Sequence, residues 1–139
     1  MKKNNIIHEF DTKIYPFKIY IVCNPDYEFI NETFSELSSK CEFSQIERDR
    51  FDNHNGLLAT TYFACHLEQR QMGVLFIIWD KKRFDVKTVT HETIHACNLI
   101  FDHLGMDKGS YFIGNDECYC YLAGYISDCL NQVRTNKFK

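Results

Sequence analysis

The apolar positions of the chain change their spacing along its length, and each spacing predicts an element. Residues 13–23, "KIYPFKIYIVC", are dense in β-branched and aromatic side chains, which predicts a strand with Pro16 at an edge or bend near its start. Residues 24–40 begin with an Asn-Pro pair suited to a helix start and continue with apolar residues at helical spacing, so we expect a helix there. Residues 43–56 are polar and end in turn-forming residues, which predicts a loop with room for a short strand or helical turn.

The second half of the chain predicts a hairpin and two long helices. The apolar runs 57–68 and 73–80 are joined by only "QRQM", so they should pair as antiparallel strands. A helical pattern follows from Asp85, a capping residue, to Gly105, a residue that ends helices. A last helix should begin at a cap formed by Asn115 or Asp116 and run to about residue 133, leaving 134–139 as a frayed tail. These elements predict one α+β domain, residues 1–139, with a small antiparallel or mixed sheet.

Composition narrows the classes of protein to which the chain can belong. The chain has 139 residues, of which 45% are hydrophobic, enough for one buried core. A net charge of -3 and scattered basic residues argue against nucleic-acid binding. The longest apolar run, "VLFIIW", is too short to cross a membrane, and no secretory signal is visible, so we expect a cytoplasmic protein without a membrane partner.

The seven cysteines favour free thiols over a disulfide framework, because their number is odd and no export signal accompanies them. Cys118 and Cys120 form a CxC pair, but no second pair stands at the spacing of a zinc finger. Packing of these thiols in the core is therefore favoured over a structural metal site.

The sequence "THETIH", residues 90–95, carries the strongest chemical signal in the chain. Residues four apart share one helix face, so His91 and His95 can both direct a ring nitrogen at one zinc ion about 2 Å away. Glu92 lies to the side of that face, where it could take a proton from a water bound to the ion. The alternative is a solvent-facing helix that contains two histidines by chance.

A catalytic zinc needs a third protein ligand. Asp102 and His103 stand about 10–12 Å further along the helix than His95, too far to share the ion. The extended metzincin motif is excluded because Asn98 and Phe101 occupy its glycine and third-histidine positions. Glu117 stands in the first turn of the next predicted helix, after a loop that lets the chain reverse.

"HETIH" followed by "NDECYCYL" resembles the gluzincin arrangement of zinc metallopeptidases. The resemblance implies a zincin-like fold, Zn2+ bound by His91, His95 and Glu117, and a peptidase in which Glu92 is the general base. It also implies that the strand over residues 73–80 lies along the cleft as an edge and holds a peptide or protein substrate by strand addition. The chain is similar, too, to small HExxH proteins of bacteriophages and of mobile elements of gut bacteria.

Only 22 residues follow Glu117 in this sequence, so we expect no counterpart of the second lobe that in larger gluzincins usually donates a tyrosine or histidine to the oxyanion. Tyr121, one turn after Glu117, and Tyr111, in the connecting loop, are the candidate replacements. The missing lobe also keeps open a second function, a non-catalytic zincin-fold protein that serves as a binding or structural component. The oligomeric state does not follow from the sequence.

Overall fold

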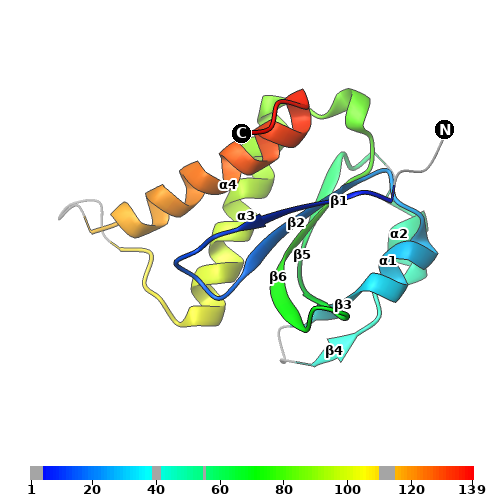
Figure 1. The fold of residues 1–139 in the computed structure, drawn as a ribbon, viewed down its shortest axis with the longest axis horizontal. Coiled ribbons are helices and arrows are strands. Elements are labelled where there is room, and N and C mark those ends of the chain that lie inside the picture. The colour runs from blue at the N-terminus through cyan, green and yellow to red at the C-terminus, as the bar shows by residue number, and fades with distance from the viewer. Residues whose placement is uncertain (1–4, 39–41, 55, 110–114) are drawn as a thin grey trace.

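The computed structural model describes residues 5–38, 42–54, 56–109 and 115–139. A mixed sheet of six strands forms the middle layer, and Figure 1 shows helices α3 (Val86–Leu104) and α4 (Glu117–Thr135) on one side of it. The short helices α1 (Tyr27–Thr33) and α2 (Arg48–Asp52) lie on the other side. Each face of the sheet carries its own apolar core, so the fold is α+β, as the sequence predicts.

The strands lie side by side in the order β1-β2-β6-β5-β3-β4. Their bounds are Ile7–Asp11 for β1, Lys18–Cys23 for β2, Phe34–Leu37 for β3, Phe43–Ser44 for β4, Ala59–His66 for β5 and Gln71–Ile78 for β6. The β5–β6 hairpin is antiparallel, as predicted, and β2 pairs with β6 in parallel, so the sheet is mixed.

The predicted edge strand is wrong, because β6 lies inside the sheet, between β2 and β5. Residues 73–78 are all buried, and an unbroken apolar run of this kind is typical of a strand covered on both faces. The edge strands are β1 and β4, but in the described part of the chain the first half of β5 also lacks a strand partner on the side of β3, and this stretch forms an open edge. Among the described residues, β3 pairs only with Ala64, Cys65 and His66 of β5.

The open half of β5 directs backbone groups outward. The N–H of Trp79 donates to the carbonyl of Leu58, and residues of an antiparallel pair alternate between facing the partner and facing away. With Ala59 opposite Ile78, the N–H and C=O groups of Ala59 and Thr61 therefore point away from β6, toward the open edge.

Two short strands differ from the sequence-based expectations. The helix expected over residues 24–40 ends at Thr33, and the chain continues as β3 because Phe34 is fully buried against Tyr20 and His66 while its backbone pairs with β5. The strand β1 has no counterpart among the predicted elements. The alternation of buried and exposed residues in β1 is weak, since none of its residues is buried. Antiparallel pairing with β2 stabilises the strand.

The helix α3 follows its predicted signals, whereas α4 begins after Asp116, as predicted, without a capping bond from the Asp116 side chain. The Asp85 carboxylate accepts the N–H of Thr88 at 2.8 Å at the start of α3, and Gly105 ends α3 in the left-handed conformation, with φ of 65°. Residues 134–139, the predicted frayed tail, make contacts: the Lys139 ammonium lies 3.0 Å from the Asp128 carboxylate and the Phe138 ring stacks on His8. No described helix is long and apolar enough to cross a membrane.

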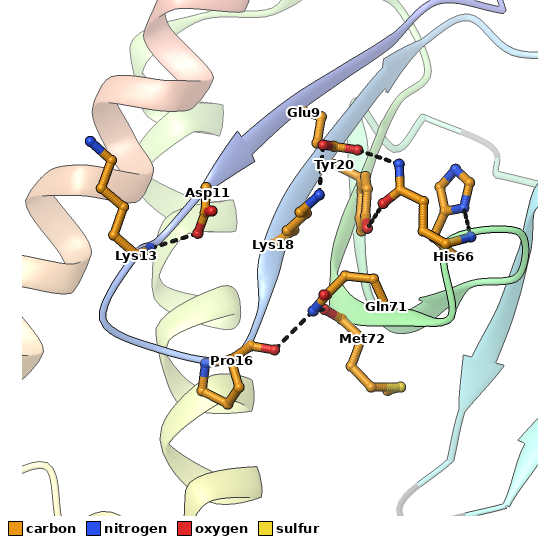
Figure 2. Close-up of polar contacts among 10 residues, drawn as sticks. Glu9, Asp11, Lys13, Pro16, Lys18, Tyr20, His66, Gln71 and Met72 are labelled. Atoms are coloured by element: carbon orange, nitrogen blue, oxygen red, sulfur yellow. Dashed lines mark hydrogen bonds and ion pairs between the residues drawn. The ribbon is translucent and has the colours of Figure 1, made fainter.

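A polar network ties the β5–β6 turn to the first two strands (Figure 2). The Glu9 carboxylate accepts from Lys18 at 2.9 Å and from Gln69 at 2.8 Å, and the Tyr20 hydroxyl donates to Gln69 at 2.9 Å. Gln71 donates to the carbonyl of Pro16 at 2.9 Å. These bonds join residues far apart in sequence, so they fix the hairpin that carries β5 against β1 and β2.

Candidate metal site

A cleft runs between α3 and the open half of β5. It has a volume of about 380 Å³, and a second hollow adjoins it toward the start of α3. The cleft is lined from α3 by His91, Glu92, His95, Asn98 and Asp102, and from β5 by residues that include Thr61. The sequence motif thus lines the same cleft as the open half of β5.

The two histidines of the motif bring their Nε2 atoms within hydrogen-bonding distance of each other. Their Nε2 atoms lie 3.2 Å apart, and both side chains are exposed. Two nitrogens bound to one tetrahedral zinc at about 2.0–2.1 Å are about 3.3–3.4 Å apart. The separation of the two nitrogens is therefore close to that of two ligands of a single zinc ion.

Glu92 points in a different direction from the histidines, toward the sheet. Its residue is only 5% exposed, and the Thr61 hydroxyl donates a short hydrogen bond to its Oε2 atom. A buried carboxylate needs such a donor because it has lost its water. Since Glu92 also lines the cleft, it combines a fixed orientation with access to the space beside the histidines.

Glu117 is not brought into the same cluster. It is exposed in the first turn of α4, and no three His, Cys, Asp or Glu side chains within residues 5–38, 42–54, 56–109 and 115–139 come close enough together to hold a metal. The described residues therefore fit zinc at two positions, His91 and His95, and the third ligand is not in place. Glu117 stays a prediction as that ligand.

The structure describes only one of the two tyrosines expected to stabilise the oxyanion. Tyr121 is 73% exposed and lines a separate small hollow beside the β1–β2 connection, with Ile14 and Tyr125. Tyr111 lies outside the described residues. Within the described part of the cleft, no tyrosine faces His91 and His95.

Tyr119 and Asn98 connect the first turn of α4 to the cleft, and sequence reasoning gave neither a role. The Tyr119 hydroxyl donates to Oδ1 of Asn98 at 2.7 Å, and its ring packs edge-on against Phe101 at 5.2 Å. Burial raises the pKa of Tyr119, with smaller contributions from Cys97 and nearby acidic groups. Asn98 stands three residues after His95, a helical spacing that could have predicted its position near the histidines. No sequence pattern indicates that Tyr119 on α4 is its partner.

Thr61 is the other residue that sequence reasoning missed. It stands 31 residues before Glu92 in a strand with no motif, so only the packing of β5 against α3 reveals it. No family model, curated protein or solved structure matches the chain.

Proposed function

We propose that the protein is a zinc-dependent peptidase that cleaves peptide bonds in the cleft between α3 and β5. The observation that carries the proposal is the convergence of the His91 and His95 Nε2 atoms, 3.2 Å apart, beside a buried glutamate that lines the same cleft. A chance pair of surface histidines would not require a buried carboxylate next to it. HExxH peptidases use these three residue types in this arrangement.

In this proposal His91 and His95 hold the ion, and Glu117 is the third ligand. Zinc bound there would polarise the peptide carbonyl and make a water acidic enough to lose a proton near neutral pH. Glu92 would take that proton and pass it to the leaving amine. Its restricted position between α3 and β5 suits this role, because a proton acceptor must be held within hydrogen-bonding reach.

The substrate would be held by the open half of β5. The outward N–H and C=O groups of Ala59 and Thr61 can pair with an extended peptide, which would then lie over the histidines. This moves the expected substrate-binding strand from β6 to β5. The wall formed by Leu57, which is 56% exposed, would contact the side chains of the peptide.

A second candidate function is a non-catalytic zincin-like protein that binds a partner, as a phage or mobile-element component could. The observation that favours it is the incomplete ligand set, since the described residues bring together two ligands instead of three. Such a protein could keep the cleft and the strand edge for binding and need no proton acceptor.

Two substitutions separate the two functions. Glu92→Gln is nearly isosteric, so it should leave zinc bound but reduce cleavage of a peptide library by about 100-fold or more, because the amide cannot accept the proton. Glu117→Ala should reduce zinc affinity steeply. A wild-type protein that binds zinc, cleaves no peptide and is unchanged by Glu92→Gln would support the binding function. Unchanged zinc affinity in Glu117→Ala would show that another group is the third ligand.

A further inference from the structure

The residue that orients Glu92 comes from the strand that carries the open edge. On the α3-facing side of β5, Ala59 and Phe63 are buried apolar residues, and Thr61 between them is half-buried and polar. Its hydroxyl donates to Oε2 of Glu92. A hydroxyl at this position gives the carboxylate one fixed partner in an otherwise apolar wall.

The backbone of the same residue faces the open edge. Because residues of β5 alternate in direction, the N–H and C=O of Thr61 point away from β6, to the side where β3 does not pair with the strand. A peptide added to this edge would bond to the backbone of Thr61 while the side chain of Thr61 holds Glu92. One residue would thus contact both the peptide and the glutamate that the reaction must bring together.

We propose that Thr61 is a positioning residue that sets the orientation of Glu92 relative to a peptide bound on β5. This inference rests on the proposed peptidase function. The hydroxyl holds one carboxylate oxygen, Oε2, of a residue that lines the cleft. Loss of the hydroxyl would release the side chain to other rotamers, and a misplacement of about 1 Å can cost about 100-fold in rate.

A purely structural role for Thr61 makes a different prediction. If the hydroxyl serves only to satisfy a buried carboxylate, its loss should lower the stability of the protein and leave the turnover of the folded enzyme unchanged. A positioning role predicts a fall in kcat with little change in KM, because the backbone groups that bind the peptide remain.

The test compares Thr61→Val, which keeps the shape but removes the hydroxyl, with Thr61→Ser, which restores it. Thr33→Val is the matched control, because the hydroxyl of Thr33 is also half-buried but bonds to the Phe29 carbonyl on α1, away from the cleft. For each zinc-loaded variant, kcat, KM, zinc affinity and the urea midpoint of unfolding are measured. A double-mutant cycle with Glu92→Met measures the Thr61–Glu92 contact in the unfolding data, without using activity.

We expect Thr61→Val to lower kcat by about tenfold or more, to change KM and zinc affinity less than about threefold, and to show non-additive unfolding midpoints with Glu92→Met. Thr61→Ser should recover most of the rate, and Thr33→Val should keep the wild-type kcat. An active wild type with equal kcat in Thr61→Val would overturn the positioning role alone. A wild type that binds zinc but hydrolyses no peptide would overturn the peptidase function and the positioning role with it. Additive midpoints would show that the contact is absent in solution.

Discussion

The Nε2 atoms of His91 and His95 lie 3.2 Å apart on an exposed face of α3, whereas the side chain of His103 on the same helix stacks on Phe63. In the first arrangement the two Nε2 atoms lie within hydrogen-bonding distance of each other, and both residues line the cleft. In the second, Nδ1 of His103 is bonded to the carbonyl of Leu99, and the ring is used for packing. The helix therefore carries histidines with two different roles.

We predict that His95→Ala lowers zinc affinity by about 100-fold or more, because it removes one of the few protein ligands of the ion. His103→Ala is the control, since it removes a histidine from the same helix without touching the pair. It should lower stability through the lost ring contact and leave zinc affinity unchanged. Titration of the metal-free proteins with zinc in a calorimeter measures both values. Equal affinities for the wild type and His95→Ala would contradict the site.

Two glycines should respond to alanine in opposite ways. A Cβ at Gly73 would lie 2.8 Å from the ring of Tyr20 and closer still to the Lys18 carbonyl, so Gly73→Ala should destabilise the β2–β6 pairing by about 1–3 kcal/mol. Gly124 in α4 has open space at this position, and Gly124→Ala should stabilise the helix by about 0.5–1 kcal/mol. Urea unfolding curves of the two variants measure these changes in the free energy of unfolding. Changes of the same sign in both variants would contradict the different surroundings of the two glycines.

The thiols should divide into fast-reacting and protected groups. All six described cysteines are free, as the sequence predicts, but the core packing expected for Cys118 and Cys120 is wrong, because both are exposed in the first turn of α4. Burial raises the pKa of Cys129 to about 12 and that of Cys23 to about 11, so both should resist a thiol reagent at neutral pH. Cys120 also has a raised pKa, from desolvation and the Asp116 carboxylate, so Cys118 should react first among the described thiols.

Ellman's reagent measures these rates directly. In a Cys41→Ser background, Cys118→Ser should remove the fastest phase, and urea should release the protected thiols. A fastest phase that persists in Cys118→Ser would contradict the assignment.

The Glu9–Lys18 contact should make stability depend on pH. The hydrogen bond from Lys18 holds the pKa of the Glu9 carboxyl below its ordinary value of 4.5. A lowered pKa in the folded state stabilises the protein above pH 4.5, and this contribution is lost as the pH falls through the lower folded value. Glu9→Gln should therefore unfold more easily than the wild type at pH 7. The two unfolding curves should converge in acid, and a constant difference from pH 7 to pH 2 would contradict this origin.

The elements that the sequence predicts best are those with strong local signals. In α3, the cap Asp85, the apolar spacing and the stop at Gly105 all lie within one segment, and the structure follows them. The strand β3 was missed because Phe34 leaves its helix for contacts with Tyr20 and His66, which lie far away in the sequence. The interior position of β6 depends on β2, which pairs with it across about 50 intervening residues.

In the candidate site, too, local contacts follow from the sequence and contacts between distant segments do not. His91 and His95 are brought together by one turn of helix, so their spacing in the sequence was enough to predict their contact. Thr61 and Asn98 acquire their partners through packing of β5 and α4 against α3, which no local pattern encodes. The position of Glu117 likewise depends on how the first turn of α4 meets α3, and a match to "DE" in the sequence does not determine it.

The parallel pairing of β2 with β6 has a consequence for the order of folding. The β5–β6 hairpin can form early because its strands are neighbours in sequence, but β2 must close a loop of about 50 residues before it reaches β6. Loop closure of this length slows folding more than it weakens the native state. Because α3 and α4 pack on the core that β2 completes, the cleft should form late, after the central pairing. Before β2 pairs with β6, a partly folded chain would therefore expose His91 and His95 to solvent without the wall of the cleft that β5 forms.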